Sequence, residues 1–130
     1  MALMGFREFN QARWVGIRPG HRGTQVLLDI NVAPGTVEII DGTQTTITYL
    51  TDWSLGMGRN VSAKTDMFIT TNANVHVCTL AYIGTMTNHP SAVAIQALQY
   101  PIELPAGYKV KVTVVGVGSD VKGYLHGWEE

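Results

Sequence analysis

The sequence predicts an all-β protein: an antiparallel two-sheet sandwich of about eight strands, similar to a jelly roll, with an N-terminal arm. Short runs of alternating apolar and polar residues recur along the chain, Gly, Pro and Asp turn signals separate them at roughly regular spacing, and no long stretch has helical periodicity. Many short strands with such turns are typical of a sandwich or barrel. At 130 residues, we expect an arm over residues 1–20 and one sandwich domain over residues 21–130.

The strand with the clearest pattern covers residues 109–114 (KVKVTV), where Lys or Thr alternates with Val. Because successive side chains of a strand point to opposite faces, this strand has one polar and one apolar face. A glycine-rich turn follows at residues 116–120, and a second extended run over residues 121–128 places Tyr124, His126 and Trp128 on one face. This order of elements predicts a terminal β-hairpin.

The sequence of the first part of the domain, residues 24–50, predicts a three-stranded meander. Strands are expected over residues 24–32, 36–40 and 43–50, separated by the turn sequences Ala33-Pro34-Gly35 and Asp41-Gly42. Pro presets φ for a turn, and Gly accepts positive φ.

Residues 51–66 (TDWSLGMGRNVSAKTD) are interpreted as a long ordered connection, because glycines and polar residues surround Trp53, Leu55 and Met57. A short strand over residues 67–71 and a turn over residues 71–74 follow. Residues 75–83 (VHVCTLAYI) are apolar on both faces, which predicts a central strand buried between layers.

A loop is predicted over residues 84–91, and a strand over residues 92–98. Alanines in this second run favour a helix, but the short span and the flanking Pro90 and Pro101 favour a strand.

The composition excludes several functional classes. The net charge is −1, so no basic field attracts nucleic acid, and no apolar run approaches membrane-spanning length. Only 15% of residues are charged, against about 25% in globular chains. A poorly charged surface is typical of a protein that works inside an assembly. The single cysteine, Cys78, cannot form an internal disulfide and is expected to be a buried, inert thiol; with no signal peptide, folding in the cytoplasm is expected.

The sequence shows no residue pattern typical of catalysis, so we expect no enzyme activity, no cofactor and no bound metal. The histidines are scattered at positions 21, 76, 89 and 126, without metal-ligand spacing or a second cysteine. Neither glycine-rich stretch, at residues 56–58 or 116–118, continues as a phosphate-binding motif. A cupin-like metalloenzyme stays as the third hypothesis, because separate strands of a jelly roll can contribute ligands to one metal.

Seven residues are candidates for a protein interface, because aromatic side chains, Met and Arg are enriched at interface cores. They are Phe6, Phe9, Arg13, Trp14, Trp53, Leu55 and Met57. The first four belong to the arm, which either packs on its own domain or docks on a neighbouring subunit. An alternative use of Trp14, Trp53 and Trp128 is a carbohydrate-binding platform.

The chain also resembles a known class of proteins over its last quarter. The LPAG turn of residues 104–107, the amphipathic strand after it, the Gly118-Ser119 turn and the GWE of residues 127–129 resemble the terminal hairpin of small all-β structural proteins of tailed bacteriophages. In size the chain is similar to the capsid decoration (cement) proteins of this class.

That resemblance implies a homotrimer that binds the major capsid protein on the outer surface of the virion and is made in the host cytoplasm. It implies no nucleic-acid or membrane partner. A tail or neck component is the alternative within the class, and a receptor- or carbohydrate-binding module is the alternative outside it.

Overall fold

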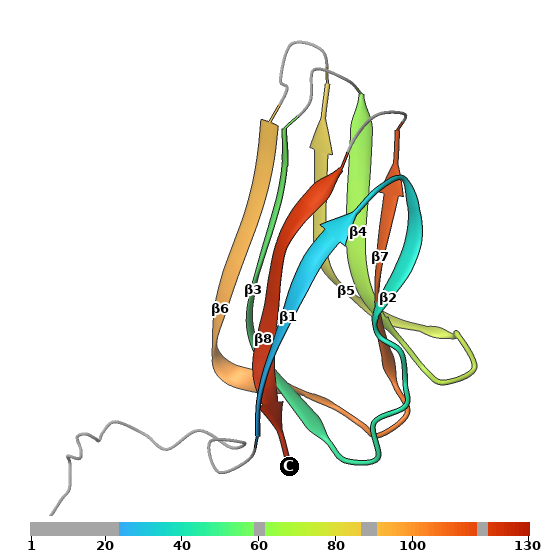
Figure 1. Ribbon diagram of the computed structural model, residues 1–130, viewed down its shortest axis with the longest axis vertical. Coiled ribbons are helices and arrows are strands. Elements are labelled where there is room, and N and C mark those ends of the chain that lie inside the picture. Colours follow the sequence, from blue (N-terminus) through green and yellow to red (C-terminus); the bar gives the residue numbers. More distant parts are fainter. Residues whose placement is uncertain (1–23, 59–61, 87–90, 117–119) are drawn as a thin grey trace, which may run out of the picture.

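The computed structural model describes residues 24–58, 62–86, 91–116 and 120–130. Within them, eight strands form two antiparallel four-stranded sheets that face each other (Figure 1). The strands are β1 (Thr24–Val32), β2 (Gly35–Ile40), β3 (Thr48–Gly58), β4 (Ala63–Thr70), β5 (His76–Thr85), β6 (Ser91–Leu104), β7 (Lys109–Val115) and β8 (Val121–Glu129). The predicted all-β sandwich is confirmed, whereas the predicted arm lies outside the described residues.

The sheets have the strand orders β1-β8-β3-β6 and β2-β7-β4-β5. Only β4 and β5 are neighbours both along the chain and within a sheet; the other described connections carry the chain from one sheet to the other. Two four-stranded sheets linked in this way form a jelly roll.

The predicted meander over residues 24–50 is wrong. β1 pairs with β8, β2 pairs with β7, and β3 lies between β8 and β6. The turns themselves are present, with positive φ at Gly35 and Gly42, but each passes the chain to the opposite sheet. Alternation shows that a segment is extended and says nothing of which strand pairs with it.

The predicted terminal hairpin is wrong for the same reason. β7 and β8 alternate as expected, with the side chains of Val110, Val112 and Val114 buried and those of Lys109 and Lys111 on the outer face. However, β7 pairs with β2 and β4, and β8 pairs with β1 and β3.

The predicted long connection over residues 51–66 is also wrong, because β3 extends to Gly58 and β4 begins at Ala63. Trp53, Leu55 and Met57 are the inward positions of a strand with period two. The glycines at positions 56 and 58 suggested a loop, but Gly56 is paired within the sheet between β6 and β8.

The predicted buried central strand over residues 75–83 is wrong, because β5 is an edge strand. Val77 and Tyr82 are 49% and 63% exposed. The register of β5 with β4 also shifts twice. The turn at residues 71–74 is confirmed by a hydrogen bond of 3.0 Å from Asn74 N to Thr71 O.

The strand predicted over residues 92–98 is confirmed and continues to Leu104 as part of β6. The loop predicted over residues 84–91 starts later, since Gly84 and Thr85 belong to β5 and Ser91 to β6; its centre, residues 87–90, lies outside the described residues.

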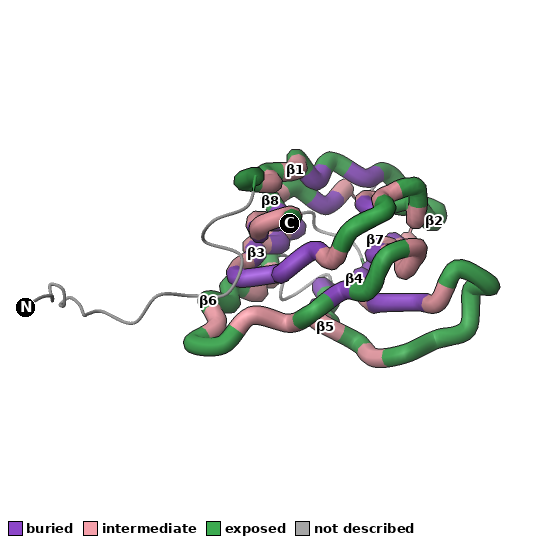
Figure 2. The backbone as a smooth tube through the Cα atoms, turned by 90° about the horizontal axis from the view of Figure 1, so that it is seen from below, coloured by how far each residue is buried: buried purple, intermediate pink, exposed green. Residues whose placement is uncertain are grey.

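The core lies between the sheets, and Figure 2 shows that strands of both sheets contribute buried positions. Leu50, Leu55, Leu125 and Ile30 fill it from one sheet, and Met67 with the valines of β7 fills it from the other. Cys78 is a free, half-buried thiol that packs against this core. In the described part of the chain, no helix could span a membrane.

Candidate interaction surface

The structure places the interface candidates of the sequence in two different situations. Trp53, Leu55 and Met57 are only 3%, 0% and 5% exposed, so their side chains pack within the subunit. Phe6, Phe9, Arg13 and Trp14 lie outside the described residues. The interface prediction for these arm residues therefore stays a prediction.

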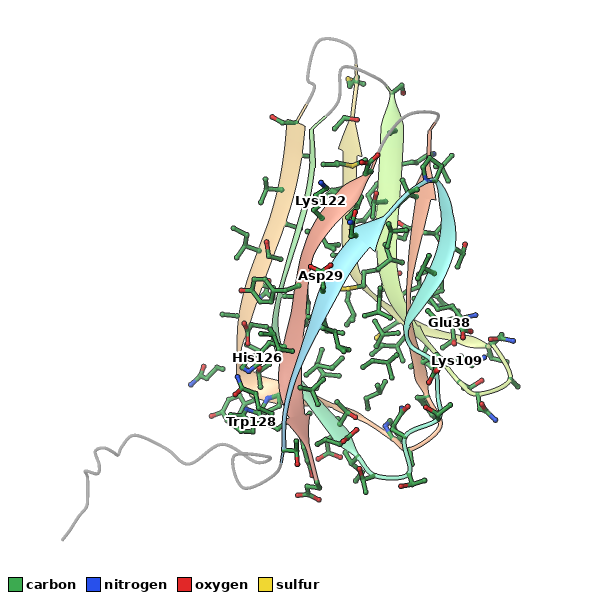
Figure 3. All side chains as sticks on the ribbon, in the orientation of Figure 1. Asp29, Glu38, Lys109, Lys122, His126 and Trp128 are labelled. Carbon is green, nitrogen blue, oxygen red and sulfur yellow. The ribbon has the colours of Figure 1, made fainter. Side chains whose placement is uncertain are left out.

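The outer face of the sheet β1-β8-β3-β6 carries a network centred on His126 (Figure 3). The Nδ1 atom of His126 lies 2.7 Å from Asp52 Oδ1, and its Nε2 atom lies 2.8 Å from Gln25 Nε2. Thr51 Oγ1 donates to the same Asp52 oxygen over 2.7 Å. The pairing of β8 with β1 and β3 brings these four residues together. No two of these three strands are consecutive along the chain, so the network depends on the tertiary fold.

This network holds Asp52 as a carboxylate. Partial burial raises the pKa of Asp52. Hydrogen bonds from Thr51 and His126, the charge of His126 and a hydrogen bond from Tyr124 together lower the pKa by more than burial raises it, so the net shift is downward. The side chains of Asp52 and His126 are both partly exposed.

The hydrogen bonds of His126 indicate a structural role. Nδ1 of His126 is engaged with the Asp52 carboxylate, and Nε2 is engaged with the Gln25 side-chain amide. Both ring nitrogens therefore already have partners within the sheet. The network joins three strands across their outer face.

The outer face of the other sheet carries an ion-pair cluster, which Figure 3 shows at Glu38 and Lys109. Glu38 Oε2 lies 3.1 Å from Lys109 Nζ and 3.9 Å from Lys111 Nζ. Both ammonium groups also donate to Asn74 Oδ1, over 3.0 and 2.8 Å. Asn74 has φ of 65°, so these bonds fix a left-handed residue of the β4–β5 turn against β7.

A cavity of about 240 Å³ opens beside β1 and β2, and its lining includes the carboxylates Glu38, Asp41 and Glu129. Hydrogen bonds from the Thr43 side chain and then from its backbone lower the pKa of Asp41. Among the described residues, no group of three or more His, Cys, Asp and Glu side chains is placed to hold a metal ion. The cavity is lined without aromatic side chains, so the tryptophan platform considered from the sequence is not located here.

Several of the exposed apolar side chains lie on the two sheet edges β5 and β6, at one side of the sandwich. On β6, Val93, Ile95 and Tyr100 are 64%, 71% and 77% exposed, and β5, with the exposed Val77 and Tyr82, adjoins β6 across the sandwich. Clustered exposed apolar groups mark protein contact sites more often than single ones do. This surface was not predicted from the sequence, where its signal is the absence of charged residues from Ser91 to Ile102.

Comparisons with known proteins give little further information. No protein-family model matches the chain, and no curated protein matches it. Among solved structures, a chain in the structure of the infectious bursal disease virus Gx strain is similar, with 12% identity and a TM-score of 0.34, over 80% of this chain and 29% of that chain. The present chain thus spans less than a third of that neighbour's length, and a likeness at this score is too distant to indicate a shared function.

Proposed function

We propose that this protein is a structural component of a virion, and most specifically a capsid decoration (cement) protein of a tailed bacteriophage. It binds the outer shell as a homotrimer and contacts the major capsid protein. The observation that carries the proposal is the apolar surface on β5 and β6, which a free monomer would leave in water. The low charge content of the chain and the phage-like terminal sequence support it.

The mechanism is mechanical rather than chemical. Each subunit bridges neighbouring coat subunits, so the shell cannot open without also breaking the added contacts. Protein interfaces of about 1,200–2,000 Å² are enough for stable association. Three linked subunits bind with higher avidity than one subunit, because after the first contact the others form at high effective concentration.

The test is to add purified protein to shells of the encoding phage that lack it. We expect cosedimentation at saturating stoichiometry, added density on the outer surface by electron microscopy, and a higher temperature of shell disruption. Light scattering of the free protein should give a mass near three times 14.2 kDa. Absence of binding to the shells would refute the cement role, and binding to tails instead would assign the protein to the tail or neck.

A deletion of residues 1–18 tests the predicted role of the arm. We expect the truncated protein to keep its β-sheet circular dichroism spectrum and to lose trimerisation or shell binding. Interface aromatics often cost about 2 kcal/mol or more when truncated, so Phe9→Ala with Trp14→Ala should have the same effect. If the truncated protein unfolds, the arm is part of the domain; if it assembles normally, the arm is not an interface.

A further inference from the structure

We infer that the first half of β6, residues 91–97, joins two copies of this chain by antiparallel strand pairing about a two-fold axis at Ala94. Within the described residues β6 pairs with β3 alone, so its other side presents unpaired backbone N–H and C=O groups. This inference rests on the proposed function, because it assigns a second copy as the partner of the β6 part of the apolar surface on which that function is based.

The other three sheet edges carry features that discourage strand addition. β2 is short, has a register shift, and bears the Glu38 ion pairs. β5 has two register shifts against β4, which distort its edge. β1 carries Asp29, an exposed charge, near its middle (Figure 3). Bulges, charges and short strands are the usual protection of edges.

The first half of β6 has none of these protections. Its register with β3 is uninterrupted from Ser91, opposite Gly58, to Ala97, opposite Asp52. The strand is uncharged as far as Ile102, and Pro101 lies beyond the shift in register that follows Ala97. A long, regular, uncharged and apolar edge is a template for pairing with another strand.

The side-chain pattern of this segment is self-complementary. In an antiparallel pair centred on Ala94, Val93 of one copy lies opposite Ile95 of the other, and the reverse pair forms at the same time. Both side chains point outward and are largely exposed in the single chain. Directly opposed β-branched side chains stabilise a sheet, and a shift of one residue would remove both apolar pairs.

A two-fold contact uses the same patch on both copies and therefore closes on itself. The pairing would join the two β1-β8-β3-β6 sheets into one continuous sheet. In an assembly of trimers, a contact of this symmetry links subunits of neighbouring trimers rather than the three subunits within one.

Disulfide trapping tests the register directly. In a Cys78→Ser background, Val93→Cys and Ile95→Cys proteins are mixed and oxidised mildly. Opposed residues have Cα atoms about 4.5–5.5 Å apart, within disulfide range, whereas position 93 of one copy is diagonal to position 93 of the other at about 7–8 Å. The mixture should therefore give a covalent dimer, and each variant alone should give little.

The matched control pairs Ile95→Cys with Val37→Cys, an exposed apolar position on the protected edge strand β2. If the 93–95 mixture cross-links no faster than this control pair, the second-copy inference is overturned.

Sedimentation velocity of Ile95→Lys, with Val37→Lys as control, tests the same contact without chemistry. A lysine at this edge should weaken the contact by about tenfold or more and leave the melting temperature of the subunit unchanged, while Val37→Lys should leave assembly unchanged. If both variants self-associate as strongly as the wild type, the inference is overturned.

The outcomes separate this inference from the proposed function. Trimers that bind shells but give no 93–95 cross-link refute the β6 pairing alone, and a cross-linked dimer that binds no shell refutes the cement role alone. If Ile95→Lys prevents shell binding and the mixture still does not cross-link, the edge accepts a strand of the shell protein, and the second-copy inference is wrong.

Discussion

The two sheets are built around central strands with opposite ways of filling the core. In β7, the inward positions are Val110, Val112 and Val114, all fully or almost fully buried. In β8, the corresponding inward positions after Val121 are Gly123, Leu125 and Gly127. One strand thus supplies a continuous row of side chains, and the other supplies a single large one between two glycines.

The glycines of β8 face large residues of the neighbouring strand. Gly123 is paired with Leu55 and Gly127 with Leu50 in β3, both fully buried leucines. A Cβ added to Gly123 would overlap the backbone carbonyl of Ser54, and one added to Gly127 would overlap that of Tyr49. The comparison shows that β8 is held by close backbone approach and β7 by side-chain packing, so the two strands should respond to different substitutions.

The largest effect is expected from Gly123→Ala. The methyl group would meet backbone rather than a movable side chain, so the sheet must separate locally. We expect a loss of about 3 kcal/mol or more in the free energy of unfolding, measured by urea denaturation. Gly58→Ala is the control, because a Cβ there meets nothing within 4 Å. Equal stability of the two variants would contradict the role of backbone approach in β8.

Val112→Ala should have the next largest effect, on the other central strand. Removing two buried methyl-sized groups and leaving a cavity costs on the order of 2–3 kcal/mol. Thermal and urea unfolding should both show the loss. A cost below about 0.5 kcal/mol would mean that the core refills around β7, and the contrast with β8 would disappear.

Asp52→Asn should have a smaller effect that depends on pH. The Asn side chain keeps an acceptor for Thr51 and His126 but loses the charge, so we expect a cost of about 1 kcal/mol near neutral pH. The pKa of Asp52 is lowered in the folded state, so its contribution is present above the unfolded pKa and is lost as the pH falls through the folded value.

Plots of the free energy of unfolding against pH for the wild type and Asp52→Asn should therefore converge as the pH falls below about 4. Parallel curves down to pH 3 would show that the charge of Asp52 does not stabilise β8 against β3.

The smallest effect is expected from Glu38→Gln on β2, beside the outer face of β7. Its ion pairs with Lys109 and Lys111 are partly exposed, and such pairs contribute about 0–1 kcal/mol. The difference from the wild type should shrink further at high salt. A cost that exceeds that of Val112→Ala would show that the outer face rather than the core determines the stability of this sheet.

The two strands β7 and β8 also illustrate how much of the fold could be predicted from the sequence. Alternation in 109–114 and 121–128 correctly identifies both strands, and in 109–114 it also identifies the polar outer face, because that information is local. The partners of each strand depend on contacts distant in sequence, so the meander and the hairpin were wrong. Glycine was the main local source of error, since Gly56 suggests a turn but lies inside β3.

The candidate surfaces were less predictable than the fold. Asp52 and His126 are brought together only by the pairing of β3 with β8, and neither residue alone indicates a network. The uncharged run that begins at Ser91 is visible in the sequence. Its location on an unprotected sheet edge is not, because edge or centre is a property of the complete topology.

The position of β8 has a consequence for the synthesis of the protein. This strand comes last among the described elements, yet it lies in the interior of its sheet, with Thr24 of β1 opposite Glu129 and β3 on its other side. A chain still lacking these residues leaves β1 and β3 with facing unpaired edges, a state prone to aggregation. We therefore expect this sheet to close only after β8 has been synthesised, so a chain that stops before Val121 should be prone to aggregation.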